Sequence, residues 1–383
     1  MAHGGHCVTR LADGGDAGRV VFVRHAIPGE RVEVVVTEGT DGDKFWRADA
    51  IDVLSASADR VTAPCPVAGP GLCGGCDFQH VSLGRQRELK ADVVAEQLRR
   101  LAGLDVSVDV QRVPGDEAGL RWRTRTRFAH LPDGRRAMSR HRSHELVPVD
   151  DCLIAVPGAE EPPVSESVTA GGATHAFAVP ADGFWQVHPG APTVLVETVL
   201  ELLAPQPGER VLDLYAGVGL FAAFLADRVG PDRVVAVEGH PRAARDAHAN
   251  LPRGVRVVRG DVGRVLATAL DEPFDLVVLD PPREGARRAV VEQVVDRAPR
   301  AVAYVACDPA ALARDVAVFA EHGYALGELR AFDLFPMTHH VECVALLTRG
   351  SGPPSRPAPR RTSRRLRPTH PAAPCPADRR PAR

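Results

Sequence analysis

Two residues in the last third of the chain could act together as a nucleophile and a base. Cys307 follows the apolar run at residues 301–306 and precedes Asp308-Pro309, and Glu342 lies in the segment FPMTHHVEC. A thiolate is a strong nucleophile that also leaves readily, and a carboxylate can take up a proton. The alternatives are a buried core cysteine and a solvated glutamate. The strand end followed by Asp-Pro favours a place for Cys307 at the rim of an active site.

A glycine-containing turn is a second feature with a chemical use. The run RVLDLYAGVGLF places Gly217 and Gly219 between a strand and a helix, where glycine lets the backbone approach a ligand closely. Glu238, which ends the next strand, is spaced to accept hydrogen bonds from ribose hydroxyls. Asp261 ends the third strand and is placed to bond an adenine, and Asp280 ends the fourth. The turn fits an S-adenosylmethionine loop, a dinucleotide loop, or a tight turn that only packs a helix on a sheet.

Four of the eight cysteines form a separate group. The spacing is Cys65-x7-Cys73-x2-Cys76, with Cys152 much further along the chain. Clustered cysteines in a chain without a disulfide framework more often bind metal or do chemistry than form disulfides. Four thiolates can hold a structural zinc ion or an iron–sulfur cluster, and the spacing alone does not choose between them.

A short basic stretch is the fourth candidate site. Residues 121–142 contain eight arginines and one acidic residue. Arg121, Arg123, Arg125 and Arg127 alternate with other residues, so in a strand their side chains would share one face. An ordinary solvated edge strand is the alternative, but an arginine stripe favours contact with a phosphate backbone.

Elements of two kinds must position these residues. Near the N-terminus, short β-rich runs separated by turns predict a small barrel, and a helix, further strands and a loop follow it. The predicted ranges are 19–24, 31–37 and 48–54 for the strands, 84–102 for the helix, 120–150 for the later strands, and 157–173 for the loop.

From about residue 181 strands alternate with helices. This pattern predicts an α/β, doubly wound, mainly parallel sheet that binds ligands at the carboxyl ends of its strands. Asp280 and Cys307 should therefore lie at one edge. The predicted strands are residues 210–214, 233–238, 255–258, 274–280 and 301–306.

Composition sets the outer limits. The chain has 383 residues, of which 44% are hydrophobic and 25% charged. It has no run near the ~20 apolar residues of a membrane helix and no apolar signal core near Met1, so we expect a cytoplasmic protein. The net charge of −2 hides an uneven distribution, because the tail 351–383 carries nine arginines and one acid. That tail is too poor in apolar residues to form a core, and we expect it to be disordered.

Taken together, these motifs resemble the uracil-C5 RNA methyltransferase family, which forms 5-methyluridine in tRNA or rRNA. The matching runs recur in the family's order: GFWQVHP, DLYAGVG, VLDPPREG, YVACDPAALARD and FPMTHHVE. The resemblance implies a Rossmann-like methyltransferase domain with S-adenosylmethionine as cofactor. It implies cofactor or site contacts for Gln186, Tyr215, Glu238, Asp261 and Asp280.

The same resemblance assigns Cys307 as the nucleophile and Glu342 as the base. C5 of uracil is too weak a nucleophile to attack a sulfonium methyl group unaided. Thiolate addition at C6 makes C5 carbanion-like, and a base later removes the C5 proton so that the cysteine can leave. The target base must also leave its stack to enter the pocket.

CGGCDFQH at residues 73–80 resembles the cluster-bearing members of this family. That resemblance implies a [4Fe-4S] cluster on Cys65, Cys73, Cys76 and Cys152, with a structural role. The opening AHGGHCVTR resembles the first loop of a TRAM domain, a small RNA-binding barrel. Relatives usually have a strand before that loop, so we expect translation of the native chain to begin upstream of Met1.

The expected organisation has four parts. They are a TRAM-like barrel at 1–60, an α+β cysteine-cluster and RNA-binding domain at 61–180, the methyltransferase domain at 181–349, and the basic tail at 350–383. The expected partner is RNA, rRNA rather than tRNA, and we expect a monomer that binds no membrane.

Other functions remain open at this point. A nicotinamide-dependent oxidoreductase would use the glycine turn and Glu238 but leave Cys307, Glu342 and the four clustered cysteines without a role. A non-catalytic RNA-binding protein would not need Cys307 and Glu342. A cytosine-C5 RNA methyltransferase typically uses two cysteines, and the one candidate second cysteine, Cys343, alternates to the opposite face from Glu342.

Overall fold

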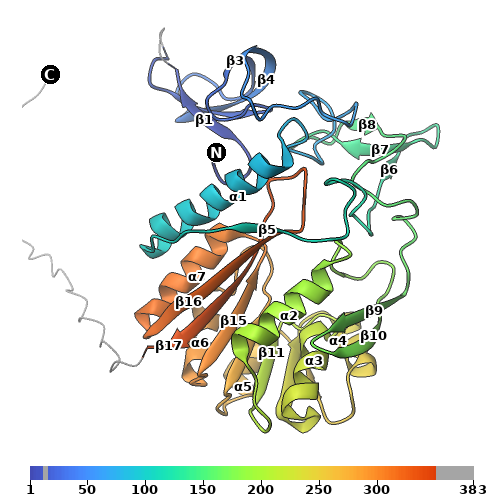
Figure 1. Ribbon diagram of the computed structural model, residues 1–383, viewed down its shortest axis with the longest axis vertical. Coiled ribbons are helices and arrows are strands. Elements are labelled where there is room, and N and C mark those ends of the chain that lie inside the picture. Colours follow the sequence, from blue (N-terminus) through green and yellow to red (C-terminus); the bar gives the residue numbers. More distant parts are fainter. Residues whose placement is uncertain (12–15, 351–383) are drawn as a thin grey trace, which may run out of the picture.

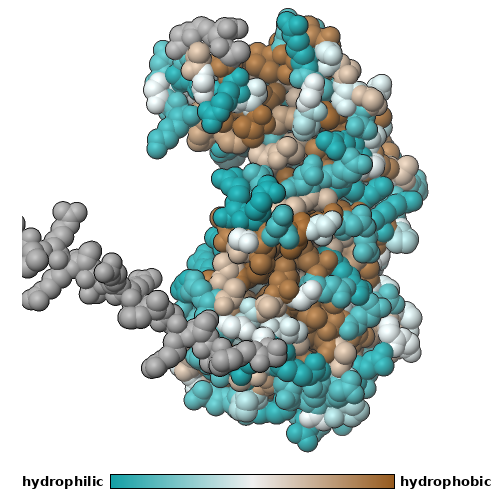
Figure 2. Space-filling view, turned by 60° about the vertical axis from the view of Figure 1, so that its left-hand side comes forward, coloured by the Kyte–Doolittle hydropathy of each residue, from teal (hydrophilic) through white to brown (hydrophobic). Residues whose placement is uncertain are grey.

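The computed structural model describes residues 1–11 and 16–350 of the chain. The predicted disorder of the tail therefore concerns residues outside the described part. Figure 1 shows a β-rich N-terminal part, a long helix beneath it, and a large α/β part below. In the space-filling view the surface is indented between the N-terminal part and the α/β part (Figure 2). No helix in the described ranges is long and apolar enough to cross a membrane.

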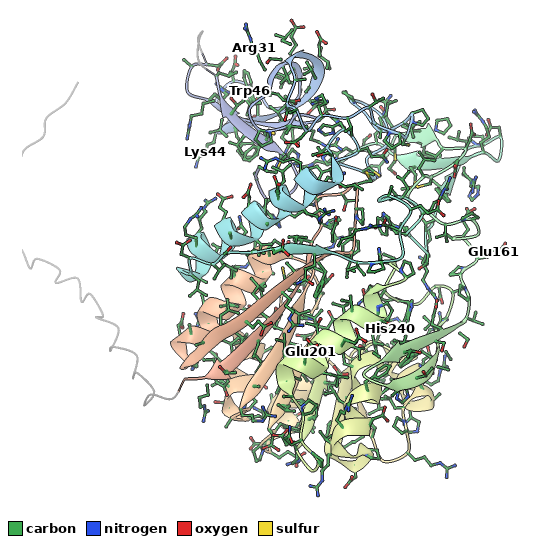
Figure 3. All side chains as sticks on the ribbon, viewed as in Figure 1. Arg31, Lys44, Trp46, Glu161, Glu201 and His240 are labelled. Atoms are coloured by element: carbon green, nitrogen blue, oxygen red, sulfur yellow. The ribbon has the colours of Figure 1, made fainter. Side chains whose placement is uncertain are left out.

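The N-terminal part is a four-stranded sheet with the order β1-β2-β4-β3. Its small core is built from alternate positions of the strands, with Val21, Val23, Ala48 and Ala50 buried. Trp46 lies in this sheet (Figure 3). The guanidinium of Arg19 lies 4.3 Å from the centre of its ring. The strands are β1 (Cys7–Arg10), β2 (Val20–Arg24), β3 (Arg31–Glu38) and β4 (Phe45–Ser55). The predicted strands are present with shifted ends, and β1 adds to them.

The middle part combines a helix with short strands. α1 (Leu83–Gln97) continues as a π-helical turn, η1 (Leu98–Ala102), and matches the predicted helix. A three-stranded sheet follows, formed by β6 (Ala129–His130), β7 (Arg136–Ser139) and β8 (Leu146–Pro148). β5 (Val110–Arg112) instead joins the edge of the large α/β sheet by pairing with β16. The middle part and the α/β part therefore share one sheet.

The prediction of a loop at residues 157–173 is wrong in its second half. β9 (Ser165–Ala170) and β10 (Ala173–Ala178) form an antiparallel hairpin that turns at Gly171-Gly172. Both glycines have positive φ, 57° and 84°, which suits a tight hairpin turn. Val168, Ala170 and Phe177 are buried, whereas polar residues occupy most of the outer positions. The strands were missed because so few apolar residues mark their inner face.

The α/β part contains an eight-stranded sheet with the order β13-β12-β11-β14-β15-β17-β16-β5. The strands from β13 to β15 are parallel, and β17 is antiparallel to both β15 and β16. Besides β5, they are β11 (Val211–Leu214), β12 (Val234–Glu238), β13 (Arg256–Arg259), β14 (Leu276–Leu279), β15 (Ala301–Ala306), β16 (Tyr324–Asp333) and β17 (Glu342–Arg349).

Helices cover both faces of this sheet and form two separate apolar cores. One core contains α2 (Ala191–Leu203), α3 (Leu220–Val229) and part of α4 (Pro241–Asn250). The other contains α5 (Val262–Thr268), α6 (Arg287–Asp296), α7 (Pro309–Glu321) and residues of α1 and η1. A short turn, η2 (Pro231–Arg233), precedes β12. The predicted doubly wound α/β class is confirmed, and the strand order reverses between β11 and β14, where such sheets bind ligands.

Candidate active site

The antiparallel strand β17 brings Cys307 and Glu342 to the same edge of the sheet. Ala306, the last residue of β15, pairs with Cys343, the second residue of β17. Cys307 therefore leaves the sheet where Glu342 enters it. Cys343 is fully buried in the apolar core that contains α5, α6 and α7. The alternation of side chains along a strand predicts that it faces away from Glu342. Cys307 and Glu342, which we predicted to act together, are therefore neighbours in the fold.

Cys307 lies in an acidic surrounding. Burial, followed by the nearby carboxyl groups of Glu342 and Asp280, raises the pKa of its thiol to about 12. The guanidinium of Arg283 acts in the opposite direction. Asp308, the next residue, caps α7 by accepting a hydrogen bond from Ala311 N at 2.7 Å. Without a further cation, the thiol is therefore held in its protonated form.

Three carboxyl groups line the carboxyl edge of the central strands, of which Asp213 and Glu342 are buried and Asp280 is half-buried. Burial raises the pKa of Asp280 to about 7. Burial, followed by repulsion from Asp280, raises the pKa of Asp213 to about 8 and that of Glu342 well above its usual value. Asp213 Oδ2 accepts a hydrogen bond from Ala222 N at 3.0 Å, but its buried Oδ1 has no partner. Such a site favours a ligand that carries positive charge, because a cation stabilises ionised carboxylates.

The glycine turn between β11 and α3 has the geometry of a close backbone approach. Gly217 has φ 57°, and Gly219 has φ 96° with a Leu251 carbon 2.9 Å from where a Cβ would be placed. Glu238 holds the turn, since its carboxylate accepts hydrogen bonds from Gly217 N at 2.8 Å and His240 N at 2.6 Å. A carboxylate has about four acceptor sites, so Glu238 can also accept bonds from a ligand.

The remaining predicted cofactor residues differ in position. Asp261 is the N-cap residue of α5, and its side chain accepts a hydrogen bond from Arg264 N at 2.9 Å. Burial, followed by the charge of Asp261, raises the pKa of the Tyr215 phenol to about 12. Gln186 is half-buried in the loop between β10 and α2.

Two members of the site escaped the sequence prediction. Asp213 is completely buried and adds the third acid, although the run DLYAGVG contains it. Arg283 supplies the positive charge that acts on Cys307 and Glu342. Its signal was the run VLDPPREG, in which it is the first charged residue after Asp280.

The four clustered cysteines converge on one cavity. Cys65, Cys73, Cys76 and Cys152 all line it, together with Arg123 and Met138. Gly75 N donates a hydrogen bond to Cys73 Sγ at 3.4 Å, and Gln79 Nε2 donates one to Cys76 Sγ at 3.3 Å. Among residues 1–11 and 16–350, no group of three or more His, Cys, Asp or Glu side chains has the arrangement of a metal site, and the thiols are free. The donor set nevertheless fits a thiolate-bound metal group, because four sulfurs and two N–H donors face one space.

The prediction that residues 121–127 form a strand with four arginines on one face is wrong. Residues 121–127 form an irregular segment whose backbone bonds to residues 153–159 and to Val187. Arg125 is only 8% exposed and donates to Pro163 O, Pro180 O and Glu166. Arg121 pairs with Asp151, and Arg123 donates to Arg125 O, while Arg127 is exposed. The even spacing misled because Arg121 has φ 52°, which breaks an extended chain.

A groove beside the cysteine cavity is lined by three arginines, of which Arg140 is ion-paired with Glu145 and Arg142 lies 3.9 Å from Glu38. Arg127, Phe128, Arg140 and Arg142 line it, along with the backbone of Gly74 and Gly75 in the cysteine segment. The guanidinium of Arg136 lies 5.2 Å from the Phe128 ring centre. Arginines around an aromatic ring match the way in which proteins bind single-stranded nucleic acid.

Comparisons with known proteins agree on one family. Residues 261–350 match the family model described as tRNA (Uracil-5-)-methyltransferase, and residues 191–304 match the methyltransferase small domain. An uncharacterized RNA methyltransferase of Streptomyces avermitilis is 44% identical over 91% of this chain and 96% of its own length. The 23S rRNA (uracil(1939)-C(5))-methyltransferase RlmD of Shewanella sp. strain ANA-3 is 32% identical, over 86% of this chain and 91% of its own.

One solved structure shares the fold over most of the chain. It is the Pyrococcus abyssi tRNA (uracil-54, C5)-methyltransferase in complex with S-adenosyl-L-homocysteine, with a TM-score of 0.63 and 21% identity. The likeness covers 89% of this chain and 99% of that one.

Proposed function

The chain belongs to the uracil-C5 RNA methyltransferase family, and we propose that it forms 5-methyluridine in ribosomal RNA, with Cys307 as nucleophile and Glu342 as base. Its activity as an S-adenosylmethionine-dependent RNA methyltransferase follows from the family. The proposal of rRNA rests on the relative RlmD, which is named for 23S rRNA. The observation that carries the assignment of roles is the meeting of Cys307, Glu342 and Asp280 at one sheet edge.

The cofactor fits the electrostatics of this edge. Asp213 and Glu342 are buried, Asp280 is half-buried, and the glycine turn follows Asp213 in the chain. S-adenosylmethionine is cationic at sulfur and would supply an electrophilic methyl group when bound. Glu238, at the end of β12, is placed to accept hydrogen bonds from its ribose.

The chain's own residues then account for the reaction. The Cys307 thiolate forms a bond to uracil C6, and the electrons of the C5=C6 bond move onto C5 and O4. C5 takes the methyl group, after which the Glu342 carboxylate removes the C5 proton. The electrons of that C–H bond restore C5=C6, and those of the C6–S bond return to Cys307 as it leaves. Positive charge beside the acids favours the ionised forms of both residues, which the chemistry requires.

We propose a [4Fe-4S] cluster on Cys65, Cys73, Cys76 and Cys152. Support comes from the convergence of the four sulfurs on one cavity and from the N–H donors of Gly75 and Gln79. The cavity lies in the middle part of the chain, so the cluster would hold that part together. Protein purified without oxygen should be brown and contain about four irons, the number in such a cluster. Colourless protein that contains zinc would contradict the proposal.

We propose that the groove of Arg127, Phe128, Arg140 and Arg142 binds the RNA backbone. Of the originally predicted stripe, Arg127 is the exposed member. Replacing Arg140 and Arg142 with alanine should weaken RNA binding and lower the salt slope by about 2, since each phosphate contact contributes about one. The exposed Arg245 and Arg253, replaced together, are a matched control. Equal salt slopes for the two double variants would contradict this RNA surface.

The function is tested with labelled methyl groups. Purified protein, a 23S rRNA transcript and S-adenosylmethionine carrying a labelled methyl should yield 5-methyluridine after digestion to nucleosides. Cys307→Ala should yield none and still bind the cofactor, because the glycine turn is unaffected. Label in any other nucleoside would refute C5 methylation, and label in tRNA but not in rRNA would refute the proposed substrate.

A further inference from the structure

The loop that delivers Glu342 is held from outside its own domain. β16 ends at Asp333 and β17 begins at Glu342, so residues 334–341 connect them. Met337 sits at the centre of this connection. Its carbonyl oxygen accepts hydrogen bonds from Asp77 N at 3.0 Å and Phe78 N at 2.9 Å, and its own N–H donates to Gln86 Oε1 at 2.8 Å. The loop conformation therefore depends on the segment that follows the clustered cysteines.

A second contact, between side chains, lies closer to the base. Asp77 Oδ2 accepts a hydrogen bond from His339 Nδ1 at 2.6 Å and a weaker one from His339 N at 3.3 Å. The Asp77 side chain is only 10% exposed, and Arg24 of the N-terminal sheet lies 3.6 Å from its other oxygen. Burial strengthens such a bond, because water does not compete for the carboxylate.

His339 is also confined from the N-terminal side. A Cβ on Gly5 would lie 2.7 Å from His339 Cβ, so the backbone at Gly5 packs directly against this side chain. His3 lies beside the same edge, with Nε2 3.0 Å from Asp308 Oδ2, next to Cys307. The histidine is thus fixed between the N-terminal part, the cysteine segment and the catalytic sheet.

We propose that Asp77 and His339 are positioning residues that fix the Glu342 carboxylate for removal of the C5 proton. This inference rests on the proposed function and deepens it. His339 is three residues before Glu342, the first residue of β17, and its side chain ties this loop to the cysteine segment, whereas Cys307 is held by β15 and the start of α7. Loss of the Asp77–His339 contact should therefore affect the proton-removal step more than cysteine addition or cofactor binding.

The test removes the contact from each side and from both. Asp77→Ala, His339→Ala and the double variant are compared in turnover at saturating RNA, in covalent RNA–protein adduct on a denaturing gel, and in cofactor affinity. We expect each single variant to lose about 10- to 100-fold in turnover, the size expected for a misplaced catalytic group. The adduct should accumulate, cofactor affinity should change less than twofold, and the double variant should be no slower than either single.

Two further variants separate positioning from general damage. His339→Gln keeps a side-chain N–H that can reach Asp77, so it should recover most of the turnover lost in His339→Ala. Asp227→Ala removes a His–Asp contact of similar length, 2.7 Å from Asp227 to His175, on the far part of α3. This control should leave turnover and adduct level unchanged.

Several results would overturn the proposal. They are wild-type turnover in His339→Ala, additive losses in the double variant, or a loss of turnover without adduct accumulation. If Asp77→Ala fails to fold, His339→Ala and His339→Gln decide the matter alone, because His339 is remote in sequence from the cysteines. Absence of 5-methyluridine from the wild-type reaction would refute the proposed function instead, so the two failures are distinguishable.

Discussion

At the scale of single residues, the site is defined by buried acids. Asp213, Asp280 and Glu342 each have a raised pKa, with burial as the largest cause. Their ionisation is unfavourable in the protein alone and becomes favourable when a cation is bound beside them. Burial, followed by Glu342 and Asp280, also keeps the Cys307 thiol protonated. Cys307, the proposed nucleophile, is therefore expected to become reactive only in the presence of the cofactor, which would protect the free thiol from side reactions.

The raised pKa of Asp213 can be tested through the pH dependence of the free energy of unfolding. Its pKa is about 8 in the folded protein, against an ordinary value of 3.8. Between these values the folded state binds more protons than the unfolded state, so the free energy of unfolding falls as the pH rises from about 4 to 8. Asp213→Asn keeps the acceptor for Ala222 N and removes the titration. The variant should gain stability relative to wild type at pH 8 by about 1–3 kcal/mol, and much less at pH 5.

Urea unfolding of both proteins without cofactor, at the two pH values, measures this difference. An equal difference at pH 5 and pH 8 would show that Asp213 does not titrate in that range. Saturating S-adenosylmethionine should stabilise wild type more than the variant.

At the scale of elements, β17 is the decisive feature. Because it runs antiparallel to β15, its amino end brings Glu342 to the edge where the parallel strands end. α1 then fixes the start of the loop that connects β16 to β17. Lys90, with a side chain 0% exposed, donates to Asp333 Oδ1 at 2.5 Å and to Phe335 O at 3.0 Å. A helix from the middle part thereby locks the start of the loop.

The Lys90–Asp333 pair should be costly to break from one side only. Lys90→Met leaves the buried Asp333 carboxylate without its cation, and the free energy of unfolding should fall by about 3–5 kcal/mol. Replacing Asp333 as well, with leucine, should recover most of that loss, since it removes the unpaired charge. Denaturant unfolding of the three proteins measures the effect. A double variant as unstable as Lys90→Met would contradict the interpretation.

Much of the element level could be read from the sequence, and its failures have physical causes. The parallel strands are mostly apolar because helices cover both faces, and β14 and β15 are apolar throughout, so residues 301–306 were easy to recognise as a strand. β9 and β10 did not, because one face is polar. Residues 121–127 alternate like a strand, yet the burial of Arg125 depends on Glu166 and two carbonyl groups distant in sequence.

The candidate site also contains residues that the sequence predicts and contacts that it does not predict. Cys307, Glu342 and Asp280 lie in runs whose order along the chain identifies them, and the fold places them together. The contact between Asp77 and His339 joins residues far apart in the chain, and although each lies in a recognisable run, nothing in either run indicates that the two side chains meet. Contacts of this kind depend on how the parts pack, which sequence spacing does not record.

At the scale of the whole molecule, the parts meet in a junction rich in histidine. His25 of the N-terminal sheet lies 6.0 Å from His80 of the cysteine segment, ring centre to ring centre. Burial, followed by the charge of Arg24, lowers the pKa of His25 to about 3, and burial lowers that of His80 to about 4. Both rings are neutral in the folded protein at neutral pH, and each has a buried Nε2 without a partner.

This junction should weaken in acid. Above the ordinary histidine pKa of 6.5 neither state binds the extra proton, and as the pH falls toward 3 only the unfolded state takes it up. The free energy of unfolding therefore falls with pH in this window. His25→Asn suits the left-handed backbone at this position, with φ 62°, and removes one of the titrating groups. Wild type should lose stability relative to this variant between pH 7.5 and pH 5, measured by urea unfolding.

A constant difference between wild type and His25→Asn across that pH range would contradict the assignment of a neutral, buried His25. The comparison with a variant is needed because the buried acids change stability in the opposite direction over part of the same range.

The central claim is that Cys307 bonds covalently to a uracil whose C5 proton is removed by Glu342. The most direct measurement is mass spectrometry of the Glu342→Gln protein after reaction with rRNA and S-adenosylmethionine, followed by digestion of both protein and RNA. We predict that the peptide containing Cys307 carries a uridine nucleotide with one added methyl group, because the amide cannot accept the proton and the cysteine cannot leave. An unmodified Cys307 peptide, together with normal release of 5-methyluridine, would contradict the claim.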